Sequence, residues 1–281
     1  MKQVVKIQDK SIELEIIQDI DSSYEPDVDI IMPSYQDRSM ANIAARSFFH
    51  FEKKLNIRII FVDPSGDNTK FDTGDYNNKI TSISAPDIKF NFTDECGKMS
   101  HSNAYALEIG ALFCKSPYVF VCHNDVLAYS ENWLSYLHSK MNNYKLAAFL
   151  KDNIRIGAAH VSGFMYDRTF YQNKNVHFWP KQKPLMDVGD EFSYYLQQQN
   201  MKYFVCPCSH NDPSLLKSIC KKNPELCDIS GDKCLDENGK VVYIHIGRGT
   251  VKMMGHYKKK NKTNYKEWIK FTKRHIDAHS I

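Results

Sequence analysis

Short apolar runs alternate with amphipathic stretches through the first half of the chain. The runs have the length and composition of buried strands and cover residues 28–32, 57–62, 80–84 and 118–122. Between them, apolar residues recur every three or four positions over Met40–Phe51, which Ser39 is placed to cap, and over Ala104–Cys114. This alternation predicts an α/β fold with a mostly parallel central sheet and helices on both faces.

The second half of the chain follows a less regular pattern. A helix from Asn132 through Met141, a strand over 146–150, a helix opened by Asp187 with its apolar face at Phe192–Gln199, a last strand at Val241–His245 and a basic helix over 261–276 are predicted. Residues 206–240 are rich in Pro, Cys, Asn and Gly and are expected to form an irregular insertion.

These elements divide the chain into three parts. We expect an N-terminal extension over residues 1–26, a main domain over 27–250 and a basic helical tail over 251–281. The main domain then consists of a first half at 27–125 and a second half at 126–250, which contains the insertion at 206–240. In open parallel sheets, ligands bind at the carboxyl ends of the strands, so the loops there are the expected place of function.

Composition and charge add two constraints. With 42% apolar and 25% charged residues, the chain has the mix of an ordinary globular protein, and it has neither a membrane-length apolar run nor an N-terminal secretion signal, so a cytoplasmic location is expected. Residues 251–281 contain nine Lys/Arg and two acidic residues. Such a tail could attract an anionic membrane surface or nucleic acid, although a solvated helix explains it equally well.

The eight cysteines do not follow the spacing of a metal knuckle. Only Cys206 and Cys208 are close together, and three more cysteines follow at 220, 227 and 234. Paired cysteines two to four residues apart are typical of zinc sites, so a structural zinc is not favoured here. Disulfides need an oxidising compartment, for which the sequence gives no signal, and most of these residues are expected to be small apolar fillers.

Several nucleotide-binding and hydrolase motifs are absent from the sequence. The only G-x-G pair is Gly247/Gly249, far from the first strand, and neither a P-loop nor a G-x-S-x-G elbow occurs. A Rossmann dehydrogenase, a P-loop kinase and an α/β-hydrolase are therefore disfavoured. The loops at 33–38, 63–69 and 123–125 are rich in Asp, Asn and Ser instead. Such loops suit a diphosphate bridged by a hard divalent cation.

Four segments together resemble the inverting family-2 glycosyltransferases with the GT-A fold. They are D-I-I-M-P-S-Y (29–35), F-V-D-P-S-G-D-N-T (61–69), the helix and strand ending in C-H-N-D (100–125), and D-V-G-D-E-F with the helix and strand that follow (187–204). The resemblance covers roughly residues 27–250. It implies inverting transfer of a sugar from a nucleoside diphosphate, with a UDP-linked donor expected. It also implies that residues 27–125 form the nucleotide-binding half and residues 126–250 the acceptor-binding half.

The resemblance assigns the donor-binding residues. Asp63 matches the acid that recognises the base, and its alternative role is to cap the turn at Pro64–Gly66. Pro33 and Tyr35 match the loop that packs against the nucleotide, although Tyr35 could equally be part of the core. The remaining candidates for donor binding are His101, which could turn helix N–H groups toward phosphate, Asn124, and Arg248, which could pair with the diphosphate.

The resemblance also implies a metal ion and a general base. Asp125 matches the last acid of the D-x-D motif that binds Mn²⁺ or Mg²⁺, but His123 replaces the first, and His245 is placed to complete the site. The missing carboxylate implies a weaker site or one of softer metal preference. For the base that deprotonates the acceptor hydroxyl, Asp190 is favoured, with Asp187 and Glu191 as close alternatives. Simple helix capping would explain any two of these acids.

The leading hypothesis is a transferase that builds a surface glycan on an oligosaccharide or lipid-linked acceptor. The basic tail, with Trp268 and Phe271, could hold it at the inner face of an anionic membrane. Alternatives are a nucleotide-sugar-binding protein that has lost catalysis, motivated by the incomplete D-x-D, and a nucleic-acid-binding protein using the Lys-rich tail, which is less favoured. A sugar-nucleotide pyrophosphorylase would need a Gly-rich loop after the first strand, where this chain reads P-S-Y-Q-D-R.

Overall fold

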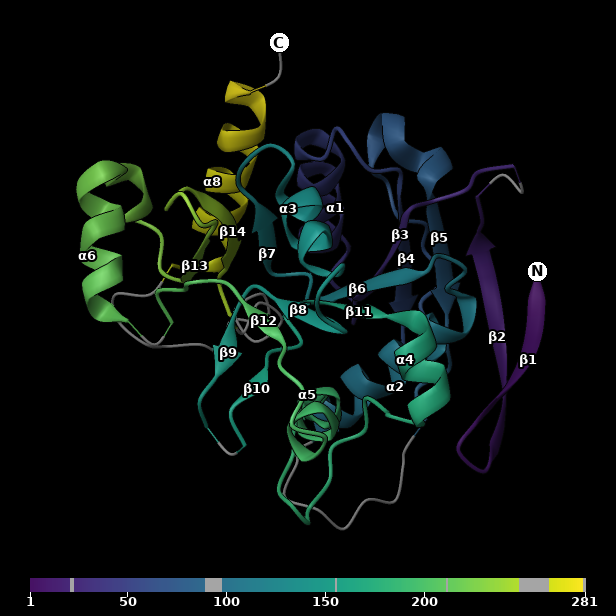
Figure 1. Cartoon of the computed structure of the whole chain (residues 1–281). Helices are drawn as coiled ribbons and strands as arrows, with labels where there is room; N and C mark the ends of the chain where they lie inside the picture. Colours follow the sequence, from purple (N-terminus) through teal and green to yellow (C-terminus); the bar gives the residue numbers. More distant parts are fainter. Residues whose placement is uncertain (21–22, 89–97, 155, 211, 248–262, 280–281) are drawn as a thin grey trace.

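A nine-stranded sheet forms the centre of the molecule (Figure 1). The computed structural model describes residues 1–20, 23–88, 98–154, 156–210, 212–247 and 263–279. In spatial order the strands are β1 (Lys2–Ile7), β2 (Lys10–Gln18), β5 (Ile80–Ser84), β4 (Ile57–Asp63), β3 (Val28–Pro33), β6 (Tyr118–Cys122), β11 (Gly163–Asp167), β8 (Leu146–Ala148) and β12 (Phe204–Val205).

The sheet is mostly parallel, which confirms the predicted fold class. The pairs β5–β4, β4–β3, β3–β6 and β8–β12 are parallel, and only β2 and β11 run against the other strands. The chain proceeds from β3 to β4 and β5 on one side, and β6 then pairs with the other edge of β3. The strand order therefore reverses between β3 and β6, which is where an open α/β sheet forms its binding crevice.

Helices cover both faces of the sheet because the central strands are apolar on both sides. Ile30, Ile59 and Phe120 belong to one core, whereas their neighbours in the sequence belong to the other. The first core packs against α1 (Arg38–Phe51) and α3 (Trp133–Lys140), and the second against α2 (Lys98–Phe113), α4 (Arg168–Lys174) and α5 (Asp190–Gln198), as Figure 1 shows.

A second, three-stranded sheet lies beside the first and carries part of the candidate site. It consists of β13 (Asp232–Leu235), β14 (Val241–His245) and β7 (Val126–Ala128). The smaller elements are β9 (Lys151–Asp152), β10 (Ala158–Ala159), η1 (Gly74–Lys79), α6 (Pro213–Lys222) and η2 (Pro224–Leu226). Residues 206–240 were expected to be irregular, but they contain α6, η2 and β13. The amphipathic face of α6 buries Ile219, which explains why this helix forms.

The C-terminal helix α8 (Tyr265–Ala278) packs onto the body of the protein. Trp268 and Phe271 are buried in a third core together with Met40, Leu127 and Ile244. Both aromatic side chains had been expected to be available for a membrane, and this expectation is corrected because they face the protein interior. None of the described helices combines the length and apolar character needed to cross a lipid bilayer.

Three further details differ from the sequence-based expectations. The side chain of Asp37, not Ser39, caps α1, because it accepts the backbone N–H of Met40. Residues 2–18, expected to lie in an extension, form the hairpin β1–β2, which pairs with β5 in the central sheet. Cys220 and Cys227 are joined by a disulfide, which was not expected. Most of the other described cysteines are buried.

A buried ion pair ties two central strands to the end of α2. Arg58 on β4 donates from Nε to Asp29 on β3 at 2.6 Å and from Nη2 to the carbonyl of Phe113 at 2.7 Å. The second oxygen of Asp29 accepts the backbone N–H groups of Lys115 and Ser116. Since Asp29 and Arg58 are 0% and 2% exposed, neither charge can be solvated if its partner is removed.

The Asp29→Ala substitution is therefore expected to lower the free energy of unfolding by about 3–5 kcal/mol, because Arg58 would remain buried without a counter-charge. Urea denaturation of both variants measures the effect. Glu13→Ala is the matched control, because its ion pair with Lys2 is 57% and 67% exposed, and such pairs contribute about 1 kcal/mol or less. Equal losses in the two variants would contradict the structural role of the buried pair.

Candidate active site

The loops predicted to be functional meet along the edge of the central sheet that is formed by the carboxyl ends of its parallel strands. They follow β3, β4 and β6, which are adjacent parallel strands. The N–H of Ser34 donates to the carbonyl of Val62 at 3.0 Å, so the first two loops leave the sheet side by side. Asp63 is the last residue of β4 and His123 follows β6, so they lie on either side of this first loop.

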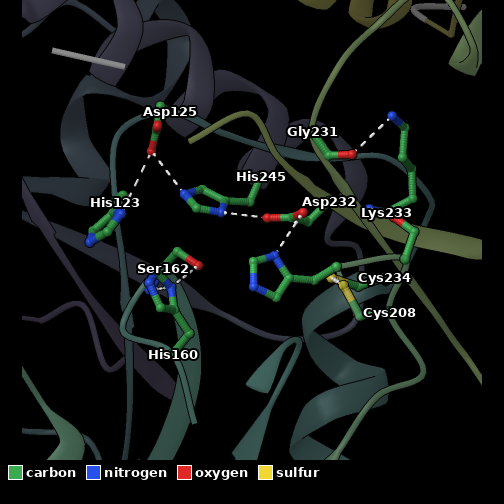
Figure 2. Close-up of polar contacts among 12 residues, drawn as sticks. His123, Asp125, His160, Ser162, Cys208, Gly231, Asp232, Lys233, Cys234 and His245 are labelled. Carbon is green, nitrogen blue, oxygen red and sulfur yellow. Dashed lines mark hydrogen bonds and ion pairs between the residues drawn. The ribbon is translucent and has the colours of Figure 1, made fainter. Parts of the chain in front are cut away.

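Two imidazoles and one carboxylate gather at this edge (Figure 2). One potential ligand atom from each of His123, Asp125 and His245 lies within 4.8 Å of the others. Oδ1 of Asp125 is 3.8 Å from Nδ1 of His123 and 3.6 Å from Nε2 of His245. Within the described ranges, this is the only group of three or more His, Cys, Asp or Glu side chains close enough to share a metal ion.

Pairing between β14 and β7 brings the two distant parts of this cluster together. His245 is the last residue of β14 and lies opposite Val126, and the N–H of Ile246 donates to the carbonyl of Asp125 at 3.0 Å. The 120 residues that separate Asp125 from His245 in the sequence are thus bridged by a short antiparallel ladder. The structure brings together the two residues predicted to bind the metal, Asp125 and His245, and adds His123.

Asp232 extends the cluster toward the surface, and sequence reasoning missed it. It lies opposite His245 in the β13–β14 ladder, and its Oδ2 is 3.2 Å from Nδ1 of that imidazole. Its other oxygen is 3.0 Å from Nδ1 of His210, which is 36% exposed. No motif could have revealed Asp232, because its position depends on the turn that folds β13 back along β14.

A third imidazole, that of His160, completes the wall of the site. Its ring centroid is 5.6 Å from that of His123 and 5.5 Å from that of His245. Its Nδ1 accepts the backbone N–H of Ser162 at 3.2 Å and lies 2.8 Å from the Ser162 hydroxyl. Nδ2 of Asn103, on α2, lies 3.3 Å from Nε2 of His123.

Burial and neighbouring charges act differently on these imidazoles. Burial lowers the pKa of His123 to about 4, although the charge of Asp125 opposes this. Burial, together with the nearby His245 and His123, also lowers the pKa of His160 well below its usual value. At His245 burial acts in the same direction, but the carboxylates of Asp125 and Asp232 outweigh it and raise the pKa. The position between these two carboxylates is therefore one that favours a positive charge.

Asp63 lies at the other side of the first loop and is engaged by Arg38. Its Oδ1 accepts the N–H and the hydroxyl of Ser65 at 2.8 and 2.6 Å, and its Oδ2 is 2.9 Å from Nη2 of Arg38. The turn-capping role is therefore present in the structure. Burial raises the pKa of Asp63, and these hydrogen bonds and Arg38 oppose that rise. Arg38 stacks on Phe71, with 4.1 Å from Cζ to the ring centroid.

The guanidinium of Arg38 keeps unused hydrogen-bonding capacity. Its Nε and Nη1 are buried and have no hydrogen-bond partner within the part of the chain that the structure describes. The nearby residues Pro33 and Tyr35 are both half-buried at the end of β3 and in the loop after it. Asp37 follows in the same loop, and burial, together with the negative charge of Asp125, raises its pKa. The first loop thus lies between Asp63 and the cluster of His123, Asp125 and His245.

The three acids proposed as the base have different surroundings. Gly189, with φ 75°, begins α5 and lets the chain turn sharply there. Asp190 is buried, and its Oδ2 accepts the N–H of Asp187 at 2.8 Å, so it closes this turn. Glu191 accepts the N–H of His177 at 3.0 Å and forms an ion pair with Lys181.

Asp187 is the acid of this group whose charge acts on a histidine of the cluster. Its side chain is half-buried, and its negative charge acts on His123, where it raises the pKa against the effect of burial. The hydrogen bond to Asp190 fixes the backbone at Asp187, and the charge of Asp187 reaches His123. Two of the remaining predicted residues are buried. His101 lies in the first turn of α2, and Asn124 lies in the sequence between the candidate ligands His123 and Asp125. Arg248 lies outside the described residues.

The fold and the site define a mixed α/β protein with a histidine-rich cluster at the switch point of its sheet. No family model matches the sequence, and no curated protein matches it. Among solved structures, a mannosyltransferase from Pyrobaculum calidifontis in complex with GDP-Man and Mn²⁺ is similar over 69% of this chain and 58% of its own, with 14% identity and a TM-score of 0.45.

Two further glycosyltransferase structures are similar to this chain. GlyE of Streptococcus pneumoniae TIGR4 matches over 89% of this chain and 62% of its own, at 9% identity and a TM-score of 0.48. An active-site mutant of LgtC matches over 63% and 72%, at 10% identity and a TM-score of 0.39. The chain thus spans about three fifths of the length of the first two structures. At these levels the similarity concerns the fold.

Proposed function

We propose that this protein is a glycosyltransferase that moves a sugar from a nucleoside diphosphate, with UDP as the expected nucleotide, to a hydroxyl of a glycan or lipid-linked acceptor. The observation that carries the proposal is the cluster of His123, Asp125 and His245 at the reversal point of the sheet. A diphosphate needs a cation, and this is the place where an open α/β sheet binds its ligand.

The residues present fit a divalent metal ion. Nε2 of His245 is buried and has no hydrogen-bond partner among the described residues, and it lies 3.6 Å from Oδ1 of Asp125. A buried polar nitrogen without a partner is costly unless a ligand satisfies it. His123, Asp125 and His245 would hold the ion, and a bound ion would supply positive charge to the diphosphate leaving group.

The other residues of the site divide into a donor side and an acceptor side. Arg38, with Asp63, Pro33 and Tyr35, forms the part of the edge assigned to the nucleoside, and the unused N–H groups of Arg38 are available to its polar atoms. The acceptor side is assigned to Asp187, next to His123.

The proposed reaction is a single displacement with inversion at the anomeric carbon. The carboxylate of Asp187 takes the proton of the acceptor hydroxyl while the acceptor oxygen forms its bond to the anomeric carbon. The bond between that carbon and the diphosphate oxygen breaks, and the nucleoside diphosphate leaves with the electron pair. Asp190 acts on this step through the turn that holds Asp187, whose N–H it accepts.

Donor turnover tests the proposal and separates it from the alternative of a nucleotide-sugar binder without catalysis. The purified protein is incubated with UDP-, GDP-, dTDP- and CMP-sugars and Mn²⁺. Thermal stabilisation reports binding by mass action, and release of the nucleoside diphosphate reports chemistry. We expect one nucleotide to give both signals. Stabilisation without release would support a pure binder. The absence of both signals with every donor would refute the proposed function.

The donor set also predicts the metal preference. Imidazole is a ligand of transition-metal ions, and Mn²⁺ accepts it more readily than Mg²⁺, which prefers oxygen ligands; two of the three candidate ligands are imidazoles. We expect chelation to stop turnover, and Mg²⁺ to bind the apoprotein more weakly than Mn²⁺ in a calorimetric titration. His123→Asp introduces a second carboxylate and should reduce the difference between the Mn²⁺ and Mg²⁺ affinities. Equal affinities for both ions in the unaltered protein would contradict a site with His ligands.

A further inference from the structure

Two neighbouring imidazoles of the site are held in opposite tautomers. Nδ1 of His245 faces Oδ2 of Asp232 at 3.2 Å. The two oxygens of Asp232 each face an imidazole nitrogen, Oδ2 that of His245 and Oδ1 that of His210, so the carboxylate is the acceptor in both contacts. Nδ1 of His245 therefore carries the proton. In the neutral ring its Nε2, which faces Asp125, then presents a lone pair, as a metal-binding imidazole does.

The opposite arrangement holds at His160. A backbone N–H can only donate, and that of Ser162 points to Nδ1 of His160 at 3.2 Å. Nδ1 is therefore the acceptor, and the proton of the neutral ring is on Nε2. Ser162 is itself fixed, because it is 0% exposed and its carbonyl accepts the Tyr243 hydroxyl at 2.6 Å. The tautomer of His160 is thus set by the backbone of its own loop.

The Nε2–H group of His160 is available to a ligand. It makes no hydrogen bond within the described part of the chain, and the ring is only partly buried. The ring lies between those of His123 and His245, at centroid distances of 5.6 and 5.5 Å, and Figure 2 shows it on the side of these rings away from Asp125. A group that donates a hydrogen bond beside a cation site is suited to an anion bound to that cation.

We propose that His160 donates its Nε2–H to an oxygen of the metal-bound diphosphate, while His245 offers its Nε2 lone pair to the metal ion. This assignment rests on the proposed function, because it takes the diphosphate as the ligand. The division of labour follows from the two hydrogen bonds that fix the tautomers. His160 is then a diphosphate-binding residue and not a fourth metal ligand.

Binding of inorganic pyrophosphate to the Mn²⁺-loaded protein tests the assignment without requiring turnover. A hydrogen bond to a charged group contributes enough that His160→Ala should weaken pyrophosphate binding by about 10- to 100-fold. His160→Gln should recover most of this loss, because its amide can donate from near the position of Nε2. Mn²⁺ affinity measured without pyrophosphate should stay unchanged in both variants, which also reports that they are folded. His245→Ala should lose Mn²⁺ binding, and His50→Gln, on α1, should change neither.

Nitrogen NMR of the histidine side chains reads the tautomers directly. At a pH where both rings are neutral, we expect the proton on Nε2 for His160 and on Nδ1 for His245. A proton on Nδ1 of His160, an Ala variant that binds pyrophosphate as tightly as the unaltered protein, or Mn²⁺-loaded protein that fails to bind pyrophosphate would each overturn the assignment. If the tautomers and the pyrophosphate affinities are as expected but no donor is turned over, the proposed transferase function is refuted, whereas the role of His160 in diphosphate binding is retained.

Discussion

The Asp125→Asn variant is expected to lose about a thousandfold or more of the sugar-transfer rate, because a divalent ion contributes several kcal/mol to the stabilisation of a developing phosphate charge. Asp125 is the only carboxylate in the group of candidate ligands and is 2% exposed. Asn has nearly the same shape, so the fold should be preserved while the charge that attracts the ion is lost. Single-turnover kinetics and calorimetric titration with Mn²⁺ measure both consequences.

Asp167→Asn provides the matched control for this experiment. Asp167 caps α4 by accepting the N–H groups of Thr169 and Phe170, and Asn serves equally well at such a position. Its rate and Mn²⁺ affinity should equal those of the unaltered protein. If Asp125→Asn kept the same Mn²⁺ affinity and rate as this control, the cluster at the sheet edge would not be a metal site.

The Asp187→Asn variant is expected to lower kcat by about 10²- to 10⁴-fold, which is the contribution of a positioned general base. The neutral amide cannot take the proton of the acceptor hydroxyl. Donor and Mn²⁺ affinities should be retained, since Asp187 is not among the residues that would hold the ion. A kcat decrease with unchanged donor KM therefore distinguishes loss of the base from damage to the donor site.

Asp190→Asn separates the two neighbouring acids. The Asn oxygen can still accept the N–H of Asp187, so the turn should persist and the rate should fall much less than in Asp187→Asn. Glu191→Gln should also keep most of the activity, because Glu191 is engaged by Lys181 and the backbone of His177. The reverse order, with Asp190→Asn inactive and Asp187→Asn active, would assign the base to Asp190.

The central strands could be predicted because their burial is local information. Ile57–Asp63 is apolar in most positions, as a strand covered on both faces must be, and Ile80–Ser84 combines two isoleucines with small polar residues. The structure buries both strands completely and forms them within one residue of the expected bounds. The edge hairpin of β1 and β2 was missed. Its exposed face makes its pattern alternate with charged residues, and only pairing with β5 gives these segments a place in the sheet.

The candidate site was predictable to a smaller extent. Asp125 and His245 could be identified from their positions after apolar runs and from the resemblance to known transferases. Asp232 and His210 could not, because they reach the site through the β13–β14 ladder and carry no motif. The surroundings that distinguish Asp187, Asp190 and Glu191 also depend on contacts with α5 that no local pattern encodes.

By itself, the sequence determined the alternation of buried strands and amphipathic helices and the acids and imidazoles that follow the strands, because periodicity and strand ends are properties of consecutive residues. The tertiary structure alone decided that β14 lies against β7, so that His245 meets Asp125. It also decided which nitrogen of each histidine carries the proton, through Asp232 at His245 and the backbone of Ser162 at His160. These decisions require residues far apart in the chain, or a particular backbone geometry, and the energy that enforces them is the cost of burying polar groups without partners.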